Sequence, residues 1–219
     1  MEVNWQNLNH GVQMKIKICG ITNTEDALLC ESLGANALGF IFYKGSKRYT
    51  PPEAAYEIIK SLSPFTMKVG VFVNESSETI NKIALTAKLN AVQLHSEESP
   101  EAIANISLPV IKSFRVDDNF DYKILENFPD TYYLLDTYSI SEYGGTGKTF
   151  DWGKIPDKYK SKIILAGGVS IENLEEIYTK IKPAAIDLSS SLESEPGKKD
   201  KEKVKRFFEK LNELKGKTC

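Results

Sequence analysis

Met14-Lys15-Ile16-Lys17-Ile18-Cys19-Gly20 is an alternating stretch that ends at a glycine, and its form recurs along the chain. Residues 15, 17 and 19 share one face of an extended strand, Ile16 and Ile18 share the other face, and Gly20 ends the strand. Tyr132-Tyr133-Leu134-Leu135-Asp136 also ends on a reactive side chain, after an apolar run typical of a parallel strand buried on both faces. A thiol and a carboxyl group are thus placed at strand ends.

Eight strands of this kind are expected along the chain. Their expected ends are 21 to 31 residues apart, an interval that holds one strand, one helix and two loops. The ends fall at Cys19, Phe42, Val73, Leu94, Arg115, Asp136, Ala166 and Leu188. Eight strand–helix units predict an α/β fold, a single-domain (β/α)8 TIM barrel. A doubly wound sheet is the structural alternative, and it normally uses fewer strands.

Two of the segments between or after these strands carry helix signals. Thr50-Pro51-Pro52-Glu53 offers an N-cap threonine, a proline at the first helical position and a capping-box glutamate. The last predicted helix has one apolar face, made of Val204, Phe207, Phe208, Leu211 and Leu214.

The size of the chain suits one domain with a sizeable core, since it has 219 residues and 41% of them are hydrophobic. We expect the barrel to span residues 14–215, followed by a tail at 216–219. Residues 1–13 lack the basic start and apolar run of a signal peptide and are interpreted as a dispensable N-terminal extension. No stretch is long enough to span a membrane.

Charge and cysteine content narrow the possible partners and the compartment. The net charge of −2 gives no support for nucleic-acid binding. The lysine-rich segment 198–205 has apolar residues at helical spacing and is interpreted as a solvated helix face. Cys19, Cys30 and Cys219 show no disulfide or metal-ligand spacing, which suits a reducing cytoplasm. The sequence leaves the choice between monomer and homodimer open.

Small residues follow the last two expected strands. One strand runs into Gly167-Gly168 and the other into Ser189-Ser190-Ser191. Small residues let backbone N–H groups approach an anion, and barrels of this type often bind a phosphate after strands 7 and 8. We therefore expect Gly167, Gly168, Ser189 and Ser190 to bind a phosphorylated substrate. The alternative is that the two glycines only form a tight turn.

Another glycine-rich segment is not a nucleotide-binding loop. Gly147-Lys148-Thr149 is like the end of a P-loop, but the required first glycine would fall on Glu142. Residues 144–147, which include Gly145, instead predict a loop after the sixth strand that covers the bound substrate.

Ten short motifs, in order, give the chain a family resemblance. It resembles phosphoribosylanthranilate isomerase, an enzyme of tryptophan biosynthesis, from residue 15 to residue 210. The motifs are Lys17–Thr22, Gly39–Tyr43, Ser46–Tyr49, Val69–Asn74, Val92–His95, Leu135–Thr137, Gly144–Gly147, Phe150–Trp152, Leu165–Gly168 and Pro196–Asp200. Each motif is moderately specific, and ten in the right order are very specific.

The resemblance implies a cofactor-free Amadori rearrangement of N-(5-phosphoribosyl)anthranilate to 1-(2-carboxyphenylamino)-1-deoxyribulose 5-phosphate. It implies that Cys19 is the general base and Asp136 the general acid. It also assigns Arg48 to the substrate carboxylate, which fits the planar bidentate guanidinium. No metal is expected. The other candidates for lining the substrate are Lys17, His95, Asp187 and Gly145.

The proposed acid and base set requirements on their surroundings. A free thiol is mostly protonated at neutral pH, so the site must favour the thiolate, and the charge of Lys17 could do so. Asp136 must keep a proton near neutral pH, which burial beside other anions can arrange. The alternative for Cys19 is a small buried hydrophobe that fills the barrel.

Two departures from the family pattern keep other functions open. Ser96 and Ser191 stand where the family usually has glycine. If the second position needs a positive φ, Ser191 would strain the phosphate loop by about 1–2 kcal/mol. A non-catalytic phosphosugar-binding paralogue is therefore one alternative. The related sugar isomerase of histidine synthesis is another, but that family places an aspartate where this chain has Cys19.

Overall fold

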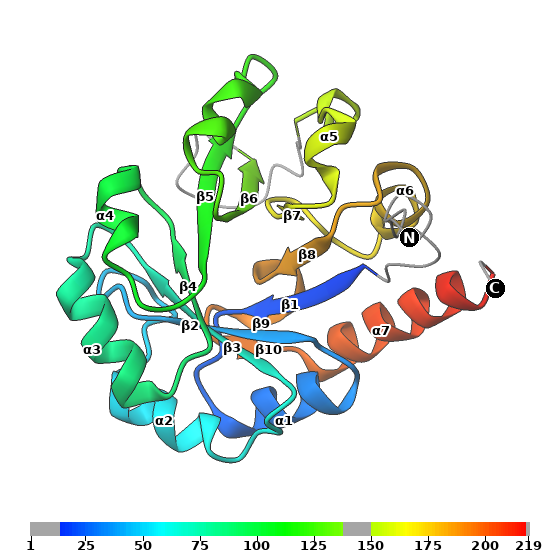
Figure 1. Cartoon of the computed structure of the whole chain (residues 1–219). Helices are drawn as coiled ribbons and strands as arrows, with labels where there is room; N and C mark the ends of the chain where they lie inside the picture. Colours follow the sequence, from blue (N-terminus) through cyan, green and yellow to red (C-terminus); the bar gives the residue numbers. More distant parts are fainter. Residues whose placement is uncertain (1–13, 138–149, 218–219) are drawn as a thin grey trace, which may run out of the picture.

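The computed structural model describes residues 14–137 and 150–217. In this part of the chain, eight parallel strands close into one barrel in sequence order, with β1 paired to β8 (Figure 1). The strands are β1 Lys15–Cys19, β2 Ala37–Ile41, β3 Met67–Phe72, β4 Ala91–Leu94, β5 Val110–Val116, β6 Tyr132–Thr137, β7 Ile163–Leu165 and β8 Ala185–Leu188. The prediction of a (β/α)8 barrel is confirmed and the doubly wound alternative is wrong. Every expected strand end falls within one residue of the observed end.

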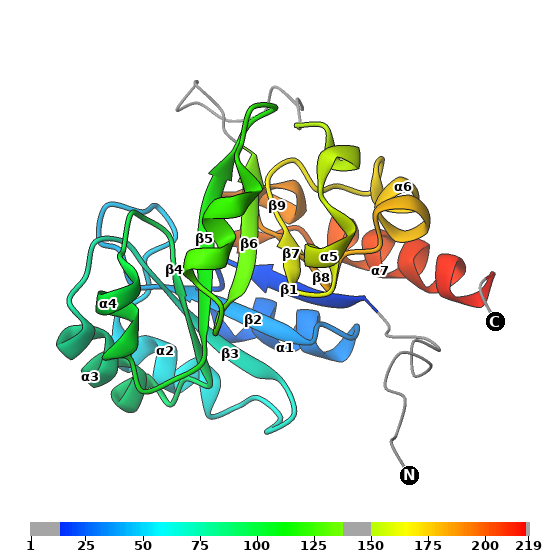
Figure 2. The same cartoon turned by 45° about the horizontal axis from the view of Figure 1, so that its top comes forward.

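The outer layer of helices is uneven. Its α-helices are α1 Thr24–Ser32, α2 Pro52–Ile59, α3 Ser77–Ala87, α4 Pro100–Ala104, α5 Asp157–Lys160, α6 Leu174–Glu176 and α7 Lys201–Gly216. The connection between β5 and β6 carries a 3₁₀ helix, Tyr122–Asn127, and α6 continues as a π-helical turn, Ile177–Ile181. Figure 2 shows α1 to α4 on one side of the barrel and α5, α6 and α7 around the other. None of the helices in the described ranges is long and apolar enough to cross a membrane.

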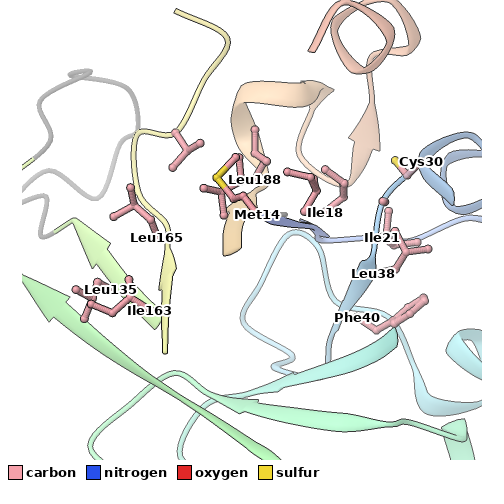
Figure 3. Close-up of a cluster of buried hydrophobic side chains, with 14 of the residues drawn as sticks. Met14, Ile18, Ile21, Cys30, Leu38, Phe40, Leu135, Ile163, Leu165 and Leu188 are labelled. Carbon is pink, nitrogen blue, oxygen red and sulfur yellow. The ribbon is translucent and has the colours of Figure 1, made fainter. Parts of the chain in front are cut away.

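The main core lies between the barrel and the helices. Ile18, Leu38 and Leu135 project outward from their strands and are fully buried. Figure 3 shows them with other hydrophobic side chains of this core. The alternate residues point into the barrel, where Leu134, Ile164 and Ala166 form a separate small cluster. Side chains of odd-numbered β1 residues therefore face the barrel interior, and those of even-numbered residues face the helices.

The predicted cap of the second helix is wrong. α2 begins at Pro52, its N-cap is Pro51, and no side chain caps it. The Thr50 hydroxyl is buried and donates to the Ile21 carbonyl oxygen at 3.1 Å. Because Pro51 and Pro52 have no N–H group, the first turn has fewer unpaired donors for a side chain to satisfy.

The lysine-rich segment begins as a hairpin and not as a helix. β9, Glu193–Glu195, and β10, Lys198–Lys199, pair antiparallel around a turn in which Gly197 has a φ of +87°. The five predicted apolar residues of α7 are all buried. The prediction that residues 198–205 form a solvated helix face is wrong for Lys199, whose side chain is completely buried. The last helix ends at Gly216, one residue beyond the expected end of the barrel domain at 215.

Candidate active site

The register of the barrel brings the reactive side chains to one end. Cys19 closes β1, and Asp136 is the penultimate residue of β6. Asp187 lies inside β8 and is paired in register with Lys17 of β1. Carboxyl ends of parallel strands form one rim of a barrel, which is where the active sites of this fold lie. The expected convergence of Cys19 and Asp136 on this rim is thus observed.

Lys17 and Asp187 form an ion pair inside the barrel. Lys17 Nζ donates to Asp187 Oδ2 at 2.8 Å, and both side chains are buried. Burial raises the pKa of Asp187, and Asp136 adds to that rise, while the Lys17 ammonium lowers it. The other carboxylate oxygen, Oδ1, is buried and has no partner among the described residues. An unpaired buried oxygen at this position is available to a ligand hydroxyl.

The Cys19 thiol is buried at the end of β1. It lies over Gly39 of β2, where an added Cβ would stand 2.8 Å from Sγ. Burial raises the pKa of the Cys19 thiol, and Asp187 raises it further, against the opposing charges of Lys17 and Lys199. The direction of the Lys17 effect agrees with the sequence expectation. It is not sufficient, because burial outweighs it, and the unliganded site favours the thiol.

Asp136 is more accessible than expected. The side chain is 32% exposed, so the expected burial is not found, although Asp187 is near enough to interact with it by charge. Its Oδ2 lies 3.4 Å from His95 Nε2 at the end of β4. Gln93 Nε2 lies 3.3 Å from the other ring nitrogen, Nδ1. With the amide nitrogen toward Nδ1, the Nε2 edge of the ring faces Asp136.

Arg48 already holds one carboxylate. Its Nε donates to Glu193 Oε1 at 2.9 Å and to Oε2 at 3.1 Å, and Nη2 donates to Oε2 at 2.6 Å. Hydrogen bonds to Glu193 are the largest cause of the raised pKa of Arg48. The Arg48 stem packs on Gly20, next to Cys19, where an added Cβ would lie 2.7 Å from Arg48 Cδ. The expected substrate-binding arginine is therefore beside the expected base.

Of the two expected phosphate loops, the one after β7 lies next to Asp136. Gly167 and Gly168 both have positive φ, at +68° and +74°, and the N–H of neither donates to another described residue. An added Cβ at Gly167 would lie 2.5 Å from Asp136 Oδ1, and Thr137 Oγ1 donates to the Gly167 carbonyl oxygen at 3.0 Å. This turn therefore lies directly against Asp136.

The serine loop after β8 leads into a 3₁₀ helix, Ser190–Leu192, with Ser189 as its N-cap. Ser191 does not have a positive φ, so the strain considered for it from the sequence does not arise. Its buried hydroxyl has no partner among the residues that the structure describes.

Three residues of this site were not expected from the sequence as site residues. Gln93, Glu193 and Lys199 are buried and contact His95, Arg48 and Cys19 respectively. The Pro196-Gly197 dipeptide was the available signal for the last two, because it marks a turn that pairs the residues on either side. Gly145 and the rest of the expected substrate-covering loop lie outside the described residues. Within residues 14–137 and 150–217, no group of three or more His, Cys, Asp or Glu side chains is placed to hold a metal ion.

Comparisons with known proteins identify the family of this chain. Residues 16–210 match the family model described as N-(5'-phosphoribosyl)anthranilate isomerase. A protein of that name from Geobacter sp. strain M21 is 44% identical over 201 residues, which are 91% of this chain and 98% of the relative.

Solved structures of the same enzyme have the same fold. The one from Thermotoga maritima has a TM-score of 0.85 at 44% identity and covers 92% of this chain and 100% of its own. A second T. maritima structure shows monomers that were generated from the dimeric enzyme. A further structure, in complex with reduced 1-(o-carboxyphenylamino)-1-deoxyribulose 5-phosphate, has a TM-score of 0.81 at 40% identity over 92% of this chain and all of its own.

Proposed function

The chain belongs to the N-(5'-phosphoribosyl)anthranilate isomerase family, and from that premise we propose how its residues divide the isomerisation between them. The reaction is the Amadori rearrangement of tryptophan biosynthesis. An acid protonates the furanose ring oxygen, and the ring opens to a protonated Schiff base. A base then removes the C2 proton. The resulting enolamine becomes the ketone when C1 gains a proton and the C2 hydroxyl loses one. Two protons enter, at the ring oxygen and at C1, and two leave, from C2 and its hydroxyl, so the rearrangement needs no external oxidant or reductant.

Cys19 is the base that removes the C2 proton. The observation that carries this assignment is its place at the rim, beside the stem of Arg48 and within reach of the charge of Asp187. C2 is one bond from C1, which carries the anthranilate nitrogen. A base next to a carboxylate-binding arginine is therefore at the correct end of the substrate. Since the unliganded site favours the thiol, the active thiolate is the minor form at neutral pH.

Asp136 is the acid that protonates the ring oxygen. The ring oxygen is bonded to C4, and C4 is bonded to C5, which bears the phosphate. The close approach of Asp136 to Gly167 in the expected phosphate loop supports this assignment. Asp187 is the second candidate acid, because burial raises its pKa. Its hydrogen bond with Lys17 favours a different role, in which the unpaired Oδ1 accepts a ribose hydroxyl.

The two ends of the substrate have separate binding groups. The Arg48 donors that Glu193 does not use bind the anthranilate carboxylate. The free N–H groups of Gly167 and Gly168, with Ser189 and Ser190, bind the phosphate. The Gln93–His95 pair orients Asp136 through Nε2.

The experiment that tests these roles is growth of a tryptophan auxotroph that lacks the isomerase. The wild-type chain should restore growth without tryptophan, whereas Cys19→Ser and Asp136→Asn should not when they are present at equal levels. Growth supported by both variants would refute the assigned acid and base. Failure of Asp187→Asn alone would move the acid to Asp187.

The enzyme works in the cytoplasm as a homodimer that buries the amino-terminal end of the barrel. Phe65, which precedes β3, is 93% exposed, and Met67 and Tyr132 at the starts of β3 and β6 are also exposed. Large apolar side chains at one end of a barrel favour self-association, and the related T. maritima enzyme is dimeric. Light scattering should give a dimer for the wild type and a monomer for Phe65→Asp, with Leu85→Asp on α3 as the exposed control. A monomeric wild type at micromolar concentration would refute the dimer.

Residues 1–13 lie before the region that matches the family model and are proposed to be dispensable. A chain that starts at Met14 should keep wild-type kcat and KM. A marked loss of kcat in that shortened chain would show that the segment contributes to the enzyme.

A further inference from the structure

Two charged side chains of the hairpin after β8 are buried, and no step of the isomerisation uses them. Glu193 begins β9 and Lys199 ends β10, and their side chains are 4% and 0% exposed. They are paired across the hairpin, and Lys199 Nζ donates to Glu193 Oε1 at 2.9 Å. Burying two charges is costly unless further polar contacts satisfy them. The partners that satisfy these two are informative, because each is a part of the active site.

Glu193 extends from the hairpin to Arg48. Its carboxylate oxygens accept hydrogen bonds from Nε and Nη2 of the guanidinium, at donor–acceptor distances of 2.6 to 3.1 Å. Among the described residues nothing accepts a hydrogen bond from Nη1. The guanidinium is therefore fixed along one edge, and its other edge is available to a second carboxylate.

Lys199 extends in the opposite direction, to the end of β1. Its Nζ donates to the Cys19 carbonyl oxygen at 2.6 Å and to the Ser189 carbonyl oxygen at 3.4 Å. One ammonium group thus joins the backbone of Cys19, the loop after β8 and the carboxylate that holds Arg48. The lysine is itself fixed, because its backbone N–H donates to Asp26 Oδ2 at 2.8 Å.

Stability alone does not account for this arrangement. Hydrophobic residues of similar volume often replace a buried ion pair with no loss of stability. An apolar pair at positions 193 and 199 would fill the same space but would make no contact that fixes a guanidinium or a backbone carbonyl. The polar contacts join the two groups that must stay at a constant separation while the substrate reacts.

We propose that Glu193 and Lys199 are positioning residues that hold the Arg48 guanidinium and the Cys19 backbone at a fixed spacing. Binding of the anthranilate carboxylate to Arg48 then places C2 of the sugar at the Cys19 thiol. This inference rests on the roles proposed above for Arg48 and Cys19. A displacement of about 1 Å costs on the order of 100-fold in rate, so a rigid link between the two has a measurable effect.

Glu193→Gln tests the link to Arg48. The variant keeps the size of the side chain but replaces an acceptor oxygen that faces Arg48 with an NH₂ donor. KM for the substrate should rise about 10-fold while kcat changes less than about threefold, since the loss falls on binding. Glu195→Gln, on the same strand and with its side chain 68% exposed, is the matched control and should match the wild type.

Lys199→Met tests the link to Cys19. Methionine has nearly the same length but no ammonium, so the Cys19 carbonyl loses its donor. Loss of the Lys199 charge also raises the pKa of Cys19, so the comparison is made at a pH at which the rates of both proteins have stopped rising. There we expect kcat to fall about 10-fold through misplacement of the base. The matched control is Lys198→Met, because Lys198 is the preceding residue and its side chain is 67% exposed.

A paired replacement covers the case in which a single variant does not fold. Glu193→Leu/Lys199→Met removes both charges at once and leaves neither buried alone. After circular dichroism has confirmed the fold, both kinetic defects should remain. A purely structural role would instead lower the unfolding temperature and leave kcat and KM at wild-type values.

A double-mutant cycle completes the test. Combining Glu193→Gln with Arg48→Lys should raise KM by much less than the product of the two single effects, since Glu193 acts through Arg48. Wild-type kinetics in the folded paired variant, or fully multiplicative effects in the cycle, would overturn the inference. If Arg48→Lys and Cys19→Ser have wild-type kinetics, the proposed function fails. If only those two are impaired and the hairpin variants match their controls, this inference alone fails.

Discussion

Lys17 Nζ and Asp187 Oδ2 lie 2.8 Å apart inside the barrel, on neighbouring strands and in direct register. The pair bears on why a lysine two residues before Cys19 does not give a thiolate. Burial is the largest cause of the raised pKa of Cys19 and outweighs the charge of Lys17, and the carboxylate paired with that lysine raises the pKa further. Three groups of the site are thus coupled through charge.

Asp187→Asn should lower the pKa of Cys19, because Asp187 raises it in the wild type. The rate of alkylation of Cys19 by iodoacetamide should therefore reach its half-maximum at a lower pH. The measurement is made in a Cys219→Ser background, with modification followed by mass spectrometry. Cys30 is an internal control, since burial raises its pKa to about 12. An unchanged midpoint would mean that Lys17 loses its proton along with its partner.

The raised pKa of Cys19 should be visible in the pH dependence of the Asp136→Asn variant, in which the opposing titration of the proposed acid is absent. A base is active when deprotonated, so a raised pKa moves its ascending limb to higher pH. We expect the residual kcat/KM of this variant to keep rising through neutral pH and past the range in which an ordinary thiol titrates. A plateau already reached below pH 7 would show that the base is a different group or that Cys19 is a thiolate in the free enzyme.

Cys19→Ser and Asp136→Asn should each lower kcat by at least about 100-fold, the lower end for a lost general acid or base. Serine scarcely ionises near neutral pH, and asparagine cannot donate the proton of a carboxylic acid. The affinity for a product analogue should change little in both variants. The double variant should lose far less than the product of the two effects if both groups serve the same step. Near-normal turnover by folded Cys19→Ser would make Cys19 a core-filling residue.

Arg48→Lys should raise KM by more than it lowers kcat. Lysine keeps the positive charge near Glu193 but cannot hold Glu193 and a substrate carboxylate on two edges of one planar group. Arg206→Lys on α7 is the control. A collapse of kcat with KM unchanged would give Arg48 a role in the chemical step.

Activity should survive dialysis against a chelator, because the proton transfers assigned to Cys19 and Asp136 complete the reaction. The measurement compares kcat before and after treatment. A large loss restored by one metal alone would refute the cofactor-free mechanism.

The barrel could be predicted because parallel strands that are buried on both faces appear in the sequence as apolar runs that end on polar residues. The short helices between β5 and β8 could not, since α5 and α6 have too few residues to show a periodic face.

Lys199 could not be placed from sequence either. Whether a lysine next to a helix is solvated or buried depends on the turn at Gly197 and on the position of Glu193 across the hairpin. The exposure of Asp136 likewise depends on how the neighbouring loops pack. Which residues stand at the strand ends can be predicted from the sequence. Whether a charged side chain is buried depends on contacts between segments that are far apart in the chain.

The contact between Gly167 and Asp136 restricts how this enzyme can be changed. An added Cβ at position 167 would lie 2.3 Å from the Thr137 backbone N and 2.5 Å from Asp136 Oδ1, and the positive φ adds to the cost. Because the nearer obstacle is backbone, a substitution here displaces the end of β6 that carries Asp136. A library aimed at a new anion should therefore keep glycine at position 167.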